Sequence, residues 1–291
     1  MWTKDLFGVE KPIIAMCHMQ PMPGDPGYDA DGGMEKVLEC ARRDLLALQE
    51  GGVDGVMFSN EFSLPYLTKV ETVTVASMAG VIGELKSEIK IPFGVNCLWD
   101  PVASIDLAVA VGGKFIREII TGVYASDFGL WNTNVGATVR HKMAVSGKEI
   151  KMLYNIVPEA ASYLGSREIE DIAKTTEFNN HPDAICVSGL TAGSETDTQI
   201  LRRVKDAVKR TPLSSSTLHT ARDPAYNTVP RRSGQKSPPA EGRLSESASS
   251  LPAPRRTLHP PQPDPERRQP PFPGLSQAAA EAPLLYPDTS A

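Results

Sequence analysis

The sequence predicts an α/β fold: a TIM-type (β/α)8 barrel, truncated to about six βα units and followed by a disordered, proline-rich tail. Apolar strand-like runs alternate with amphipathic helical segments six times before residue 211. The runs are almost continuously apolar, which is typical of strands buried on both faces of a parallel sheet. Polar residues follow every run. A doubly wound sheet also accommodates six units, but it gathers its ligand-binding residues at one switch point. Polar residues after every run therefore favour the barrel.

The first three units begin with strands and end with well-marked helices. Apolar residues such as Val37, Ala41 and Leu45 recur at helical spacing, and Gly51 and Gly52 stop that helix. Pro101 stands in the first turn of a later helix, where its missing N–H costs nothing. The predicted elements are, in order, strand 12–19, helix 34–50, strand 53–59, helix 72–89, strand 92–98 and helix 101–111.

The next three units have the same spacing, which leaves room for the crossover helix that each parallel strand pair needs. A long loop over 121–132 interrupts them, and loops of this length inside compact domains are usually functional or mobile. The predicted elements are strand 114–120, helix 135–145, strand 149–156, helix 167–176, strand 183–188 and helix 198–209.

The pattern ends after residue 211, where a seventh strand is due. Residues 212–291 hold 16 of the chain's 25 prolines and contain no Ile, Met, Cys or Trp. Such a composition buries too little apolar surface to offset the entropy of ordering. We therefore predict two parts, an incomplete barrel over 1–211 and a disordered Pro/Ser/Arg-rich tail over 212–291. The abrupt change in composition is typical of out-of-frame translation, a hypothesis that sequencing the locus tests.

Composition and motifs argue against several classes of protein. The net charge of −5 argues against nucleic acid as the main partner. No apolar run reaches the ~18 residues that span a bilayer, and residues 1–10 do not form a signal peptide. The chain has no metal motif and no cofactor motif, and its cysteines are too far apart in sequence for a C-x-x-C pair. These features predict a reduced, cytoplasmic protein without a membrane span, a metal or a cofactor.

Polar residues at the carboxyl ends of barrel strands converge on one face, where barrel enzymes keep their active sites. The candidates for catalysis are His18, Asp127 and Glu159. His18 is typical either of a general base or of a hydrogen-bonded structural histidine. Asp127 lies in the long loop and fits either an Asx turn or a lid carboxylate.

A second set of polar residues fits ligand binding. Arg117 stands inside an apolar strand, where a guanidinium needs an anion, either an internal carboxylate or a bound phosphate or carboxylate. The small residues after the sixth strand form either a tight turn or an anion-binding nest of main-chain N–H groups. The candidates for substrate binding are Asn60, Glu61, Asn96, Arg117, Asn155, Ser188 and Thr191.

Several of these residues lie in segments that resemble the BtpA/SgcQ family. The segments are AMCH at 15–18, GVDGVMFSNE at 52–61, FGVN at 93–96, FIR at 115–117 and CVSGLTAG at 186–193. NEFSLPY at 60–66 and NIVPE at 155–159 are similar to the enterobacterial SgcQ-like branch. The resemblance covers residues 6–208 and does not extend to strands seven and eight, where barrels of this kind often bind phosphate.

The resemblance implies a phosphate-binding TIM-type barrel of unknown reaction. Its SgcQ-like branch is associated with sugar phosphotransferase gene clusters, and BtpA with photosystem I accumulation. We therefore expect either an enzyme that acts on a phosphorylated sugar or similar small anion, or a non-catalytic accessory factor for a protein complex. In the first case His18 is the acid–base group, Arg117 the anion clamp, and Asn60 and Asn96 orient the ligand. Open barrel edges predict homo-oligomers or aggregation.

Overall fold

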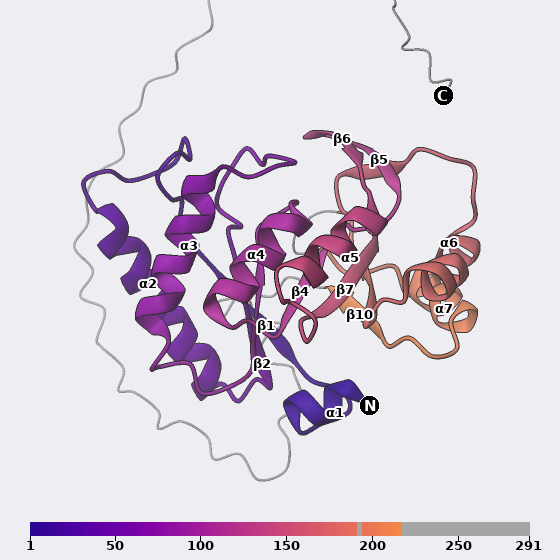
Figure 1. Ribbon diagram of the computed structural model, residues 1–291, viewed down its shortest axis with the longest axis horizontal. Coiled ribbons are helices and arrows are strands. Elements are labelled where there is room, and N and C mark those ends of the chain that lie inside the picture. The colour runs from indigo at the N-terminus through magenta and orange to yellow at the C-terminus, as the bar shows by residue number, and fades with distance from the viewer. Residues whose placement is uncertain (191–193, 217–291) are drawn as a thin grey trace, which may run out of the picture. The chain divides into compact units, whose positions relative to one another are not determined.

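The computed structural model describes residues 1–190 and 194–216. Its main feature is a curled sheet of seven parallel strands in the order β1-β2-β3-β4-β7-β9-β10, which makes a half-barrel (Figure 1). The strands are β1 (Ile14–His18), β2 (Gly55–Ser59), β3 (Phe93–Asn96), β4 (Phe115–Glu118), β7 (Lys151–Val157), β9 (Ala184–Ser188) and β10 (Leu213–Ser216).

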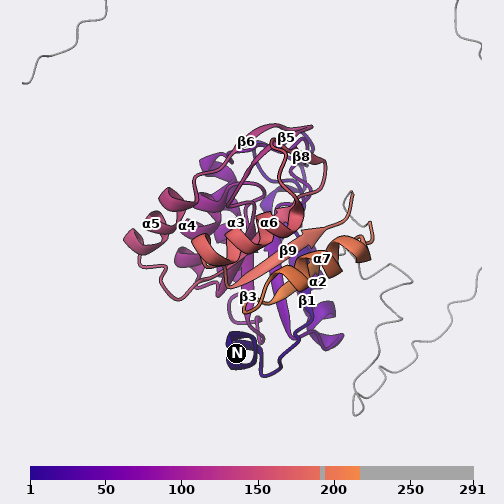
Figure 2. The ribbon, with the colours of Figure 1, turned by 90° about the vertical axis from the view of Figure 1, so that its right-hand side faces the viewer.

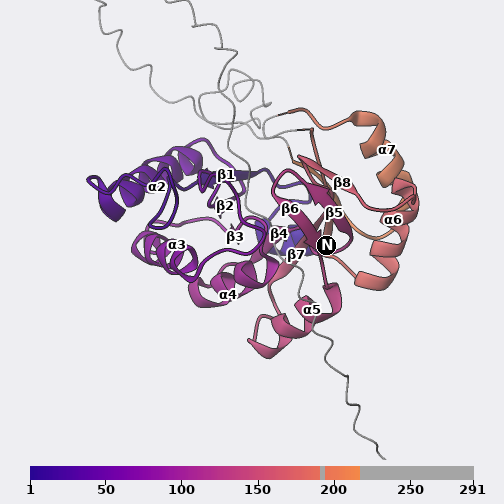
Figure 3. The ribbon, with the colours of Figure 1, turned by 90° about the horizontal axis from the view of Figure 1, so that it is seen from above.

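Helices connect successive strands of the sheet, as parallel pairing requires. They lie around the strands when the molecule is seen from above (Figure 3). The connecting helices are α2 (Gly33–Glu50), α3 (Thr72–Leu85), α4 (Pro101–Val111), α5 (Val135–Ala144), α6 (Ile169–Thr175), which continues into the π-helical turn η1 (Thr176–Asn180), and α7 (Thr198–Ala207). The predicted α/β class and the order of the six predicted units are confirmed.

The predicted number of strands is one too low. Residues 213–216, assigned from the sequence to the tail, form β10 and pair in parallel with β9, with Leu213 opposite Ile185. The segment reads Leu-Ser-Ser-Ser, so it carries no apolar run. Its place depends on main-chain pairing with β9 and on the packing of Leu213 against an apolar cluster of β7, β9, α6 and α7, which composition does not reveal. The rest of the predicted disordered tail, from residue 217 onward, lies outside the described residues.

The two faces of the sheet have different cores, because successive side chains of a strand point to opposite faces. On the outer face, Phe58, Val95 and Ile116 pack with the buried stripes of the helices. On the inner face, Phe115 and Leu153 form a smaller apolar cluster. Helix α1 (Trp2–Phe7) joins this inner cluster, and no helix was expected in this segment.

Helix α1 packs where the strands begin. Phe7 lies edge-on to Phe115 at 5.7 Å between ring centroids, and the Trp2 indole donates to the Asp183 carbonyl at 2.8 Å. A Cβ at Gly55 would stand 2.6 Å from the Phe7 ring, so only glycine leaves room for it. The inner face is thus covered by apolar side chains at its amino end, and its polar residues lie toward the carboxyl end.

A three-stranded antiparallel sheet lies at the opposite end from α1 (Figures 1 and 2). It consists of β5 (Val123–Ser126), β6 (Gly129–Asn132) and β8 (Ala161–Tyr163). The segment 121–132, expected to be an irregular loop, is therefore mostly a hairpin. Its Phe128 and Trp131 pack with Trp99 and Tyr66 from other loops, at ring-centroid distances of 4.7–6.1 Å. These aromatic rings fix the hairpin against the carboxyl end of the main sheet.

In the part of the chain that the structure describes, no helix is long and apolar enough to cross a membrane. Within the same residues, β1 and β10 are the edges of the sheet, each paired on one side. Edge strands recruit other strands through their unpaired main-chain groups. We predict that the 291-residue chain elutes from size-exclusion chromatography as dimers or larger species. A monodisperse monomer that melts cooperatively would contradict this prediction.

Candidate functional site

A layer of polar side chains lies above the apolar inner cluster. Each of its members stands two residues beyond an inner-face position of the same strand, so strand alternation directs it to the same face. Main-chain pairing sets them side by side, with Ser59 opposite both His18 and Asn96. The layer consists of His18, Ser59, Asn96, Arg117, Asn155 and Ser188.

His18 and Glu61 form the first part of the site. The His18 ring is 9% exposed, and its Nδ1 lies 3.6 Å from Oε2 of Glu61, itself 8% exposed. The Tyr66 hydroxyl donates to the Glu61 carboxylate and carbonyl at 3.1 and 2.9 Å. Burial lowers the pKa of His18 below 6.5, the charge of Glu61 opposes this, and that of Arg117 adds to it. Burial therefore favours the neutral imidazole, which is the form that accepts a proton.

Arg117 and Glu159 form the second part. Arg117 is half-buried on β4, and its guanidinium makes no ion pair and no hydrogen bond with any described residue. Glu159 is half-buried in the loop after β7. Burial and the charge of Glu61 raise the pKa of Glu159, and the positive charge of Arg117 opposes this rise. The positive charge of Arg117 thus acts on the titration of both His18 and Glu159, although the guanidinium forms no ion pair with either.

The remaining polar candidates are held by the protein itself. The Asn155 amide donates to the Ser188 hydroxyl at 2.8 Å, which joins β7 to β9. The side-chain amide oxygen of Asn60 accepts from the Leu98 N–H at 2.8 Å and fixes the loop after β3. Asn96 occupies a position of the layer, but its amide, with the nitrogen facing β4, donates to the outer-face Glu118 carboxyl group and to the Arg117 main-chain carbonyl. Asn60 and Asn96 are therefore partly occupied with structural contacts.

Two candidates are not brought into this cluster by any described contact. Asp127 lies in the turn of the β5–β6 hairpin with an exposed side chain, and its N–H donates to the Ala160 carbonyl at 3.2 Å. Its carboxylate forms no hydrogen bond or ion pair with another candidate within the described residues. Thr191 lies outside them. Catalytic and binding roles for these two residues remain predictions.

The structure adds residues that the sequence did not single out. Ser59 is fully buried at the end of β2, and its hydroxyl has no hydrogen-bond partner among the described residues. Strand alternation from Met57 indicates that Ser59 faces the same side. Serine is a weaker signal for a site than the Asn60 and Glu61 that directly follow it. On the outer face, the Ser104 hydroxyl donates to the Glu118 carboxyl group at 2.9 Å, and burial raises the pKa of Glu118.

No three His, Cys, Asp or Glu side chains are grouped as metal ligands within residues 1–190 and 194–216. The site as described is instead one cation, one neutral imidazole and two carboxyl groups, of which Glu159 has a raised pKa. Burial is the largest cause of both shifts, and it favours the neutral forms of His18 and Glu159. The cation provides the complementary charge for an anionic ligand.

The titration of His18 tests this electrostatic arrangement. We expect its midpoint, followed by NMR, to lie below 6.5 because burial disfavours the charged ring. Arg117→Gln should raise the midpoint because it removes a nearby positive charge. Glu61→Gln should lower it because it removes a negative one. Midpoints that respond to neither substitution would show that these three side chains do not form one cluster in solution.

Comparison with known proteins finds several relatives of this chain. It is 63% identical over 216 residues to the sgc region protein SgcQ of Escherichia coli (strain K12), covering 74% of this chain and 81% of that protein. It is 30% identical to the photosystem I biogenesis protein BtpA of Synechocystis sp. (strain PCC 6803), covering 71% and 72%. It is 33% identical to the uncharacterized protein TK2179 of Thermococcus kodakarensis, covering 67% and 74%.

Solved structures overlap the chain more loosely. The 7,8-dihydropteroate synthase of Vibrio fischeri gives a TM-score of 0.46 at 12% identity, covering 70% of this chain and 72% of that one. The N-acetylmannosamine-6-phosphate 2-epimerase of Clostridium perfringens gives 0.42 at 15%, covering 73% and 79%. Similarity at these values bears on neither reaction nor ligand. The model of the BtpA family, by contrast, matches residues 9–221. The chain belongs to the BtpA family.

Proposed function

We propose that the protein is an enzyme that carries out acid–base chemistry on a phosphorylated sugar or a similar small anion at the carboxyl end of its sheet. The observation that supports this most directly is the unpaired guanidinium of Arg117, half-buried among polar side chains on the inner face. A charged group that loses water costs several kcal/mol unless a counter-charge compensates it. A bound phosphate or carboxylate supplies that counter-charge with two-pronged hydrogen bonds.

The neighbours of Arg117 supply the proton transfers. The neutral His18 is suited to accept a proton from a ligand carbon or hydroxyl group. Glu159, whose pKa is raised, is suited to donate one. His18 and Arg117 stand at the carboxyl ends of β1 and β4, Glu159 follows β7, and the charge of Arg117 influences both titrating groups, which supports their action on one small molecule held there. Glu61 orients and polarises His18, and Tyr66 fixes Glu61.

The other members of the polar layer bind and orient the ligand. We assign ligand contacts to Asn155 and Ser188 on β7 and β9, and to Asn96, which also shapes the strand that carries Arg117. Ser59, between His18 and Asn96, adds a hydroxyl group on the same face. Asn60 contributes mainly by fixing the loop that carries Leu98 and Trp99. Catalysis by Asp127 and ligand binding by Thr191 also remain part of the proposal.

A second candidate function is a non-catalytic role in the assembly or stability of a protein complex. The similarity to the photosystem I biogenesis protein BtpA favours it. In that case the polar layer would be a structural feature, and no small anion would be bound with affinity that depends on Arg117. The two functions therefore differ in a measurable way.

A thermal-shift panel separates the two functions. The purified chain is heated with aldose phosphates, ketose phosphates, the matching free sugars and inorganic phosphate. Enzyme-like binding predicts that some sugar phosphates raise the melting temperature by several degrees, because a ligand at 100 times its Kd stabilises by about 2.7 kcal/mol. The free sugars should shift it far less. No shift with any phosphorylated compound would favour the accessory role.

A further inference from the structure

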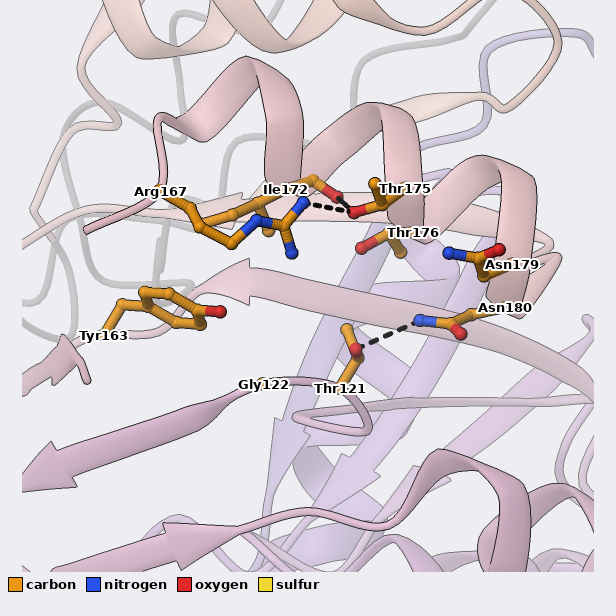
Figure 4. Close-up of a pocket in the computed structure, with 9 residues that line it drawn as sticks. All are labelled: Thr121, Gly122, Tyr163, Arg167, Ile172, Thr175, Thr176, Asn179 and Asn180. Carbon is orange, nitrogen blue, oxygen red and sulfur yellow. Dashed lines mark hydrogen bonds between the residues drawn. The ribbon is translucent and has the colours of Figure 1, made fainter. Parts of the chain in front are cut away.

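A cavity of about 370 Å³ lies between the three-stranded sheet and the α6–η1 helical segment (Figure 4). Its walls come from the loop after β4, from β8 and from the helical segment, and none of its lining residues belongs to the candidate site. Its size falls within the range of small-molecule sites. Hydroxyl, amide and guanidinium groups line most of it, so it is polar rather than an apolar packing defect.

The side chains of the cavity present hydrogen-bonding groups toward its centre. The Tyr163 hydroxyl and the Arg167 guanidinium face the Thr176 hydroxyl across the cavity (Figure 4). Thr121 accepts a hydrogen bond from the Asn180 amide at 3.0 Å, so its own hydroxyl proton remains for a ligand. Thr176 is 2% exposed, which places a hydroxyl group in the deep wall.

Arg167 gives the cavity a positive charge. Its guanidinium donates to the Asp171 carbonyl at 2.9 Å and to the Thr175 hydroxyl at 2.8 Å, both of them neutral acceptors. Its charge is not paired with a carboxylate of any described residue. The nearby acids have other partners, with Glu168 and Glu170 bound to Arg203 and Asp171 paired with Lys174. An arginine held in place by neutral groups keeps its charge and remaining donors for an anion.

We propose that this cavity is a second ligand site, which takes a small hydroxylated compound carrying a phosphate or carboxylate group. Arg167 binds the anionic group, and Tyr163, Thr121 and Thr176 bind the hydroxyl groups. The site also contacts the sheet above the polar layer, because the Tyr163 ring lies 5.5 Å from that of Tyr124 on β5. Binding here stabilises the position of the hairpin whatever reaction the polar layer performs.

Calorimetry in the Arg117→Gln background tests the second site without interference from the first. Glycerol 3-phosphate and glycerate are the probes, and glycerol is the uncharged comparison. The Arg117→Gln chain should bind at least one probe and should bind glycerol more weakly. Adding Arg167→Gln should weaken binding about 10-fold or more, because a hydrogen bond to a charged group is lost. Adding Tyr163→Phe, which keeps the ring, should weaken it about 3- to 10-fold.

The matched control adds Arg202→Gln, which makes the same charge change at an exposed arginine of α7 outside the cavity. It should leave the affinity unchanged. Equal affinities with Arg167→Gln and with Arg202→Gln would overturn the proposal, and so would the absence of binding by either probe. Failure of the first site alone would be seen differently, as equal binding of the sugar phosphates by the wild-type and Arg117→Gln chains, and it would leave the second site standing.

Discussion

Replacing Arg117 by glutamine should weaken the binding of a phosphorylated sugar about 10- to 150-fold while leaving the fold intact. The loss follows from removing a charge-assisted hydrogen bond, worth about 1.5–3 kcal/mol. Stability should stay constant or rise, because the substitution removes a half-buried charge that has no partner among the described residues. Calorimetry with the best compound of the thermal-shift panel measures the first effect, and thermal melting without ligand measures the second.

Arg202→Gln serves again as the matched control, since it changes the net charge equally at an exposed position. It should change neither affinity nor stability. If Arg117→Gln instead lowered the melting temperature and left affinity alone, Arg117 would be a structural residue and the proposed enzyme would lose its ligand-binding group.

Replacing Gly94 by alanine should destabilise the protein by about 3 kcal/mol. Gly94 lies on β3, and a Cβ there would stand 2.6 Å from the Phe115 carbonyl oxygen and would also overlap the Phe115 ring. The carbonyl belongs to β4 and cannot move without disturbing the sheet, and the ring is enclosed by Phe7 of α1. Overpacking of such a site costs about 1–3 kcal/mol, and a clash with the main chain falls at the upper end.

Gly80→Ala is the matched control for this prediction. Gly80 is an exposed residue of helix α3, and a Cβ there would have nothing within 4 Å. Alanine should stabilise the chain by about 1 kcal/mol through helix propensity. Urea unfolding of both variants measures these changes in the free energy of unfolding. Equal stability of Gly94→Ala and the wild type would mean that the inner face is not packed as described.

The order of the first six strands of the main sheet and their helices could be predicted, because these strands are continuous apolar runs and the helices have an apolar stripe. Helix α2 shows this best, with Val37, Ala41, Leu45 and Leu48 buried on one side. What escaped prediction lacked such a pattern. Strand β10 has three serines and pairs through its main chain. The hairpin over 123–132 has four-residue strands whose aromatic residues pack against distant loops, so its structure depends on partners that local sequence does not show.

The part of the candidate site that lies at the ends of the strands could be predicted from the sequence. His18, Asn96, Arg117, Asn155 and Ser188 follow from the alternation of each strand, once the barrel class is known. The loop residues were harder. Glu61 reaches His18 because Tyr66 holds it, and Asp127 is carried by a hairpin whose turn leaves its side chain exposed. Loops are directed by tertiary contacts, and the spacing of residues along the sequence contains no record of those contacts.

The most direct test of the central claim is a crystal structure of the chain with the tightest-binding sugar phosphate. The account predicts that the phosphate group lies within hydrogen-bonding distance of the Arg117 guanidinium, with the sugar facing His18 and Glu159. A ligand bound elsewhere, with Arg117 uninvolved, would contradict the account.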